Sequence, residues 1–240
     1  MTALFAQTAP LRYRRAVSAR FLDDAARAAF AKAVKSIEDA SAIEVVVAVR
    51  RKSAGYRHAN ALVGVLAAFA GLAAMLFSDY EFSIPSILID PFVVGLIAGG
   101  LVELAPGIKR LLTPPRMLDR EVLRSARAAF IERGVHNTRD RSGLLVYISW
   151  LEQRVAIVRD SGLDRVLPDD AVTRLERELT TAMRISGSAL ADRLETLLSK
   201  VTVGMPRRAD DANELPDAID SDLAKPRARR DVPKPPGDPS

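Results

Sequence analysis

The chain has 240 residues, of which 48% are hydrophobic and 27% are charged, and its formal net charge is +5. The charged fraction is that of an ordinary soluble surface, so the apolar excess must be concentrated in one part of the chain. The absence of cysteine excludes disulfides and thiol chemistry and fits a reducing compartment. Basic runs interleaved with aromatic residues are also absent, so we expect no nucleic-acid partner.

The amino-terminal part predicts one half of a folded domain, residues 21–58. Residues 1–20 are expected to be irregular, and they lack the apolar core of an export signal, which favours a cytoplasmic start. A helix is predicted from residue 22 to residue 37, because apolar residues recur there at spacings of three and four. The run IEVVVAV at 43–49 predicts a short strand that is covered on both faces.

A hydrophobic hairpin is predicted at residues 59–112. The stretch 59–78 carries no charge, and as a helix it would be about 30 Å long, which matches the hydrocarbon core of a bilayer. A second span is predicted at about 85–105. Small residues at helical spacing, among them Gly64 and Gly95, would let the two helices pack closely.

The start of the second span is open to two interpretations, because Asp90 and Pro91 resemble a helix cap followed by a first-turn proline. A helix starting at Pro91 would be only about 22 Å long before residue 106, so a start near Pro85 is favoured. That start places Asp90 inside the span. In the alternative, Asp90 stays at the rim and the helix continues through a kink at Pro106 to Leu112.

The charges that flank the hairpin predict its orientation. Basic residues stand on both outer flanks, whereas the connecting loop 79–90 has neither lysine nor arginine. The positive-inside rule therefore predicts a multi-pass protein of the cell membrane with both termini cytoplasmic. The lipid bilayer is then a partner, and anionic headgroups are the expected counterions for the flanking residues Arg50, Arg51, Lys52, Arg57, Lys109, Arg110, Arg116 and Arg120.

The chain beyond the hairpin predicts the second half of the domain, residues 113–204. We expect a helix at 117–133, a strand at 144–150, a three-residue connection and a strand at 154–159. Two amphipathic helices should follow, of which the second ends at about residue 203. Because the first two strands are joined through a helix, they should be parallel neighbours. The predicted fold class is thus α/β, with a small mixed sheet covered by helices on both faces and interrupted by a transmembrane helical hairpin. The tail 205–240 is rich in Pro, Asp, Arg and Lys and is predicted to be disordered.

Residues 138–163, TRDRSGLLVYISWLEQRVAIVRDSGL, resemble the TPM-domain family. The amino-terminal helix and strand are similar to the opening half of that domain, and Glu214 to Asp217 resemble the ending of its bacterial membrane branch. The resemblance implies an α/β sandwich. It implies no single activity, because the relatives include thylakoid proteins linked to photosystem II repair with a proposed acid phosphatase activity, metal-binding bacterial domains and a membrane modulator of acetylcholine receptors.

Acidic residues are the remaining candidates for chemistry, since the sequence has no P-loop and no G-x-S-x-G motif. Asp140 precedes the second strand, while Asp160 and Asp164 follow the third, so all should lie at one end of the sheet. Such a cluster could hold Ca²⁺ or Mg²⁺ through oxygen ligands. In the alternative, these are loop aspartates paired with arginine. We expect Glu152 and Arg154 to form a surface pair beside the hairpin turn, and the two histidines, His58 and His136, to lie on the surface.

Two functions remain open at this point. The favoured one is a non-catalytic interaction, assembly or maintenance factor that holds a membrane or peripheral protein partner at the bilayer. The alternative is a metal-dependent phosphatase of the acid type. It needs clustered carboxylates in a cleft, and Asp140, Asp160 and Asp164 are the candidate ligands.

Overall fold

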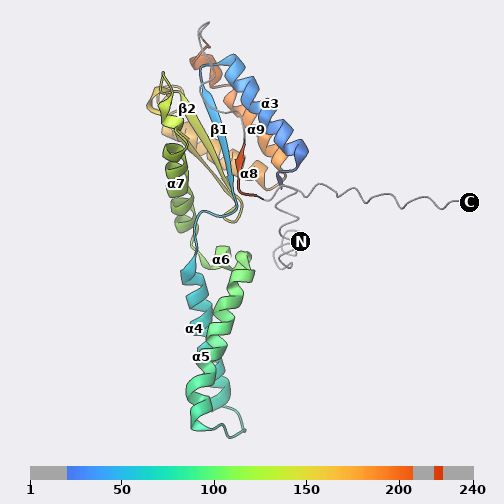
Figure 1. The fold of residues 1–240 in the computed structure, drawn as a ribbon, viewed down its shortest axis with the longest axis vertical. Coiled ribbons are helices and arrows are strands. Elements are labelled where there is room, and N and C mark those ends of the chain that lie inside the picture. The colour runs from blue at the N-terminus through green and yellow to red at the C-terminus, as the bar shows by residue number, and fades with distance from the viewer. Residues whose placement is uncertain (1–20, 208–218, 224–240) are drawn as a thin grey trace, which may run out of the picture.

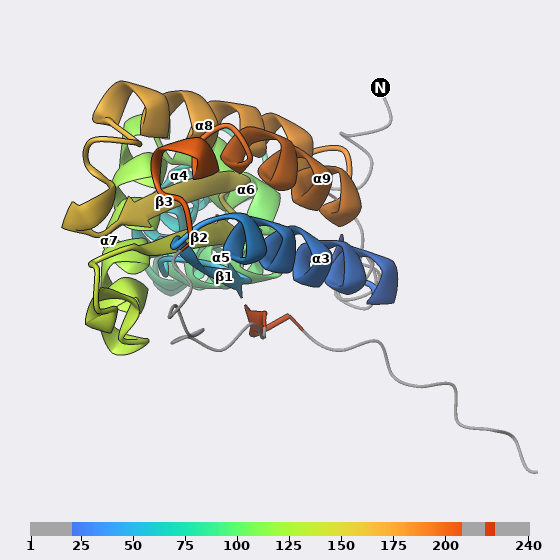
Figure 2. The ribbon, with the colours of Figure 1, turned by 90° about the horizontal axis from the view of Figure 1, so that it is seen from above.

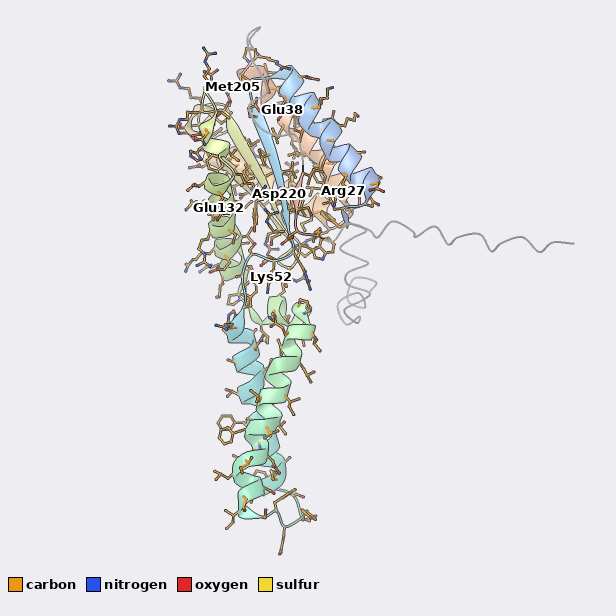
Figure 3. The ribbon with its side chains drawn as sticks, in the orientation of Figure 1. Arg27, Glu38, Lys52, Glu132, Met205 and Asp220 are labelled. Carbon is orange, nitrogen blue, oxygen red and sulfur yellow. The ribbon has the colours of Figure 1, made fainter. Side chains whose placement is uncertain are left out.

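The computed structural model describes residues 21–207 and 219–223. A long helical hairpin projects from one end of an α/β domain (Figure 1). We call this end of the domain the hairpin end and the opposite one the far end. Lys52 marks the hairpin end, whereas Glu38 and Met205 lie at the far end (Figure 3).

The domain begins with α3 (Asp24–Ala40) and β1 (Glu44–Arg50), which confirms the predicted helix and strand. Asp23 is the cap of α3, since its side chain accepts a hydrogen bond of 2.8 Å from the backbone N–H of Ala26. An aspartate at this position satisfies one of the free N–H groups of the first turn.

Within the described residues the sheet has four strands in the order β3-β2-β1-β4. The strands after β1 are β2 (Gly143–Ser149), β3 (Arg154–Arg159) and β4 (Asp220–Ser221). β1 and β2 are parallel over their whole length, from Glu44 opposite Gly143 to Arg50 opposite Ser149. β3 is antiparallel to β2. The predicted mixed sheet with parallel neighbours is therefore confirmed.

Helices cover both faces of the sheet, so the domain has three layers (Figure 2). On one face lie α3, α8 (Asp169–Met183) and α9 (Gly187–Leu198), and on the other lies α7 (Pro115–Glu132). Successive side chains of β1 point to opposite faces of the sheet and so enter two hydrophobic cores. Val45 and Val47 belong to one buried cluster, and Val46 belongs to the other. This arrangement confirms that β1 is covered on both faces.

The hairpin consists of α4 (Arg57–Leu76) and α5 (Ile84–Leu101), followed by a 3₁₀ turn (Val102–Leu104) and the short helix α6 (Pro106–Leu112). Among the described residues, two helical stretches are long and apolar enough to cross a membrane, Arg57–Leu76 and Ile84–Leu104, each with a mean hydropathy of 2.0. Only 6% of the first stretch and 22% of the second are buried. Neither one is therefore a core helix of the domain.

α5 begins at Ile84, where the Ser83 side chain accepts the N–H of Ser86 as a cap. The start near Pro85 is thus confirmed, and the alternative in which Asp90 caps the helix is wrong. Pro91 lies inside α5 and packs near Gly71 of α4. The helix does not continue through Pro106, because α5 ends at Leu101 and α6 starts at Pro106 as a separate element.

Two predicted boundaries are wrong. The connection between β2 and β3 comprises residues 150–153 rather than three residues, since Ser149 pairs directly with Arg154. Gln153 adopts a left-handed backbone with φ of 54°, which closes this turn. The last predicted helix ends at Leu198 instead of near residue 203, and a 3₁₀ turn (Thr202–Gly204) follows it.

The tail contains ordered pieces that the sequence did not predict. Pro206 forms a β-bridge with Ser41, and β4 extends the sheet on the free side of β1. The prediction of disorder is therefore wrong for residues 205–207 and 219–223. For residues 208–218 and 224–240 it lies outside the described residues.

Candidate functional site

A buried carboxylate lies where the domain meets the hairpin. Glu152, in the turn between β2 and β3, is 0% exposed. Its Oε1 accepts hydrogen bonds from the Ser53 backbone N–H at 2.9 Å and from the Tyr56 hydroxyl at 2.7 Å. Its Oε2 accepts one from the Ser149 hydroxyl. Such bonds to an ionised acceptor are stronger than those between neutral groups.

Further hydroxyl groups extend this network. Ser53 Oγ lies 2.8 Å from Ser149 Oγ and 3.4 Å from the Tyr147 hydroxyl oxygen. The hydroxyl of Ser125, on α7, donates to the Ser53 carbonyl oxygen at 3.1 Å. The network therefore joins the β1–α4 linker, β2, the β2–β3 turn and α7. We call it the neck cluster; it comprises Ser53, Tyr56, Ser125, Tyr147, Ser149 and Glu152.

The environment keeps the tyrosines of the neck cluster protonated. Burial raises the pKa of Tyr56 far above its ordinary value, and the hydrogen bond to the Glu152 carboxylate raises it further. Burial also raises the pKa of Tyr147. Both phenols are therefore hydrogen-bond donors at neutral pH, which suits the Tyr56 hydroxyl to the Glu152 carboxylate.

Tyr56 is also the residue at which the linker turns into the hairpin. It precedes the first residue of α4 and has a left-handed backbone with φ of 46°. That conformation is costly for a large side chain and persists only where surrounding contacts enforce it. The buried hydroxyl contact with Glu152 supplies such a constraint, so the entry angle of α4 is tied to the sheet.

A second set of contacts closes the hairpin at its base. Lys109 of α6 is 4% exposed, pairs with Glu103 and donates to the Gly55 carbonyl oxygen at 3.4 Å. The other contact joins His58 Nε2 to Thr113 Oγ1 at 3.0 Å. These contacts bridge the residues that enter and leave the hairpin. Both of its ends are therefore fixed to each other as well as to the domain.

The predicted metal ligands lie at the far end, opposite the neck cluster. Asp140 precedes β2, and Asp160 and Asp164 follow β3, so the loops that carry them share one end of the sheet. These loops touch, because a Cβ on Gly162 would lie 2.4 Å from the Asp140 carbonyl oxygen. The predicted proximity of the loops is correct.

The side chains of these aspartates have partners of their own. Asp160 caps the turn that follows β3 by accepting the Ser161 N–H at 2.7 Å, and it lies 3.8 Å from Arg141 Nη1. Asp164 pairs with Arg159 Nε at 3.0 Å. In residues 21–207 and 219–223, no group of three or more His, Asp or Glu side chains could hold a metal ion. The Ca²⁺ or Mg²⁺ site stays a prediction without support from this geometry.

The prediction of a surface pair at the hairpin turn is wrong. Glu152 points inward, and Arg154 pairs instead with Asp119 of α7, at 2.8 Å. The sequence held one signal for this, since a serine at the end of an apolar strand that is buried on both faces needs a polar partner. Ser149 is that serine, and Glu152 follows it by three residues. His58 is exposed as predicted, whereas His136 is half-buried beside Phe130.

The carboxylate of the neck cluster is shielded from solvent. Glu152 is enclosed, and both of its oxygens accept hydrogen bonds from protein groups. A general base must lie within hydrogen-bond distance of the substrate proton that it removes, and no substrate can approach an enclosed carboxylate that closely. An open hollow between α7 and β3 has Arg127, Arg159 and Asp164 in its wall and does not contact the neck cluster.

The fold and site together define a mixed α/β domain with a helical hairpin inserted between a strand and its crossover helix. No protein-family model and no curated protein matches the sequence. Among solved structures, the chain is similar to the NMR structure of the BA42 protein from the psychrophilic bacterium Bizionia argentinensis, with 15% identity and a TM-score of 0.48. The similarity covers 82% of this chain and 92% of the BA42 chain. A likeness at this level assigns neither family nor function, and the resemblance to the TPM-domain family stays a prediction.

Proposed function

We propose that the chain is a membrane-anchored interaction module, in which the hairpin spans the bilayer and the α/β domain binds a protein partner at the cytoplasmic surface. The observation that carries this proposal is the neck cluster. It fixes the hairpin to the domain through a buried carboxylate rather than through a solvent-exposed linker. A domain connected in this way presents its surfaces at a set height and angle above the membrane.

The exposed side chains of the hairpin support the anchor. Large apolar side chains cover its outer surface, and Phe69, Leu96 and Phe92 are 66%, 80% and 71% exposed. Exposed apolar surface of this extent is typical of a site covered by lipid or protein. Gly64 and Gly95 instead face the partner helix, since a Cβ on Gly95 would lie 2.6 Å from the Gly64 carbonyl oxygen. Close contact between small residues is how helices associate in lipid.

The charges at the hairpin end support the cytoplasmic orientation. Arg110 of α6 has a pKa lowered from its ordinary value, first by burial and then by the positive charges of Arg184 and Arg154. Arg57 at the start of α4, Arg110 in α6 and Arg116 at the start of α7 all lie at the two ends of the hairpin, so positive charges gather where the domain faces the proposed bilayer surface. Anionic headgroups would neutralise them, and a cytoplasmic leaflet provides such headgroups.

Excision of the hairpin tests the proposal. We would replace residues 59–112 with a short Gly/Ser linker and compare this variant with the full chain. The expected result is that the full chain resists extraction of cell membranes at alkaline pH, whereas the excised variant is soluble and keeps slow amide exchange in β1 and β2. Recovery of the full chain in the soluble fraction would contradict the anchor.

The phosphatase alternative is tested on the same two proteins. Turnover of p-nitrophenyl phosphate would be measured with and without added Mg²⁺ or Ca²⁺. We expect no turnover above that of a buffer control. Metal-dependent turnover that is abolished by Asp160→Asn would favour the enzyme over the interaction module.

A further inference from the structure

A short piece of the tail occupies the edge of the sheet. β4 lies parallel to β1, with Asp220 opposite Ala48 and Ser221 opposite Val49. The next residue, Asp222, donates its N–H to the Val49 carbonyl oxygen at 3.2 Å. An exposed strand edge is a template for the backbone of another segment, and here the tail of the chain itself fills that position.

Basic groups recognise the acidic side chains of this segment. Asp220 Oδ2 pairs with both Arg50 and Arg133, which come from the end of β1 and the end of α7. Arg50 Nη1 also donates to the Asp220 carbonyl oxygen at 3.1 Å. The second carboxylate, that of Asp222, accepts the Arg51 backbone N–H at 2.6 Å. The edge of β1 therefore binds two acidic residues that are separated by one position.

Apolar side chains bury the end of the segment. Leu223 is 4% exposed and belongs to the same buried cluster as Val49, against which Trp150 packs. Ile219 packs against this cluster from the other end of the segment. The occupied site thus has the pattern Ile-Asp-x-Asp-Leu, with an apolar residue at each end.

Backbone pairing holds the tail segment at this site over a short length. The strand pairing is only two residues long, so side-chain contacts must supply much of the binding. The segment belongs to the same chain as the domain, and a short covalent connection raises the effective concentration of a segment to about 1 mM. A segment with so short a strand pairing gives way to a competing segment that is present at a higher local concentration.

We propose that the outer edge of β1, with Arg50 and Arg133, is a binding site for an extended acidic segment of a partner protein, and that residues 219–223 occupy it in the free chain. The proposal rests on the proposed function as an interaction module and specifies the chemistry of its partner. Charge complementarity selects the occupant, because two guanidinium groups converge on one carboxylate. A membrane protein with an acidic juxtamembrane segment meets the concentration requirement, since both proteins are confined to one surface.

The test uses the full chain in a neutral detergent and a fluorescent peptide with the sequence of residues 217–225. The variant Asp220→Ala/Leu223→Ala releases the tail segment, and anisotropy measures binding of the peptide. We expect binding to the released variant to be at least tenfold tighter than to the unchanged chain. Addition of Arg133→Gln to the released variant should weaken binding at least tenfold. A peptide with asparagine in place of Asp220 and Asp222 is the control and should not bind.

Other outcomes overturn the proposal. One is a released variant that keeps the circular dichroism of the unchanged chain and yet fails to bind the peptide. If that variant does not fold, Asp222→Asn is used as the released variant instead. Binding of the peptide to it, and the weakening of that binding by Arg133→Gln, then decide. An unchanged chain that is dimeric by light scattering and becomes monomeric on Asp220→Ala would show that a second copy supplies the segment. Peptide binding in detergent does not depend on the anchor, so failure here is distinct from failure of the extraction experiment.

Discussion

Glu152 and Tyr56 lie 96 positions apart in the sequence and are joined by a hydrogen bond of 2.7 Å. The hairpin separates them, so this bond connects residues that come before and after the inserted segment. It also combines a buried carboxylate with a tyrosine whose backbone is left-handed. The hydrogen bond offsets the cost of both features. The Tyr56 hydroxyl supplies a partner for the buried Glu152 carboxylate, and the carboxylate holds Tyr56 in its left-handed conformation.

Glu152→Ala should loosen the neck. The substitution leaves the Ser53 N–H and the Tyr56 hydroxyl without their acceptor, and each buried unsatisfied group costs about 1–3 kcal/mol. We expect a lower melting temperature and faster amide exchange over residues 53–57, with little change in β1. Hydrogen exchange with mass spectrometry measures both segments in one experiment.

Glu178→Ala is the matched control for this substitution. Glu178 lies on the outside of α8 and pairs with Arg193 on the surface, where an ion pair contributes about 0–1 kcal/mol. Its loss should leave the exchange of residues 53–57 unchanged. Equal effects of the two variants would mean that Glu152 has no special role at the neck.

The sequence predicted the regular part of the fold well and the neck poorly. Strands β1 and β2 are long apolar runs, and the spacing of α7 has a clear helical period, so local patterns were sufficient for them. The neck cluster depends on contacts between residues almost one hundred positions apart, and local patterns carry no information about such pairs. β4 was missed for a different reason. Its two residues are polar, and they pair with β1 through backbone groups and arginine contacts.

Gly143→Ala should destabilise the domain, because a Cβ at this first position of β2 would lie 2.0 Å from the Val135 carbonyl oxygen. Backbone atoms cannot move aside as a flexible side chain can, and overpacking of this kind costs about 1–3 kcal/mol. We expect a lower melting temperature in detergent. Gly55→Ala is the control, since a Cβ there meets nothing within 4 Å. A melting temperature unchanged by Gly143→Ala would contradict the close approach of these two backbones.

Gly95→Leu should separate the helices of the hairpin. A Cβ at Gly95 would lie 2.6 Å from the Gly64 carbonyl oxygen and 2.9 Å from the Ala68 Cβ, whereas a Cβ at Gly100 meets nothing within 4 Å. The matched variant is therefore Gly100→Leu, on the same helix. Cross-linking of cysteines introduced on α4 and α5 should fall with Gly95→Leu and stay unchanged with Gly100→Leu. Equal cross-linking in both variants would argue against close packing of the hairpin.

The orientation is open to direct measurement, because the chain has no cysteine of its own. A cysteine in place of Ser83, at the tip of the hairpin, should react with a membrane-impermeant reagent in intact cells. A cysteine in place of Ser199, after α9, should react only once the cells are opened. The reverse pattern would place the α/β domain outside the cell.

Glu176 should make the stability of the domain depend on pH. Burial raises the pKa of this α8 carboxyl above its ordinary value and outweighs the hydrogen bond that its Oε1 accepts from the Ile157 N–H at 2.9 Å. The folded state therefore binds the proton more tightly than the unfolded state does. This contribution to stability is complete below the unfolded pKa of 4.5 and is lost as the pH rises through the higher folded pKa.

Glu176→Gln removes the titration and keeps an oxygen that accepts the Ile157 N–H. We expect the variant to melt at a higher temperature than the unchanged chain near neutral pH, and the difference should shrink as the pH falls toward the unfolded pKa of 4.5. Melting curves from about pH 4 to about pH 8 measure this difference. Glu178→Gln is the control, because the Glu178 carboxyl lies on the surface beside Arg193. If the melting temperatures of Glu176→Gln and of the unchanged chain differ by the same amount at every pH, the pKa of Glu176 is the same in the folded and unfolded states, and the prediction is wrong.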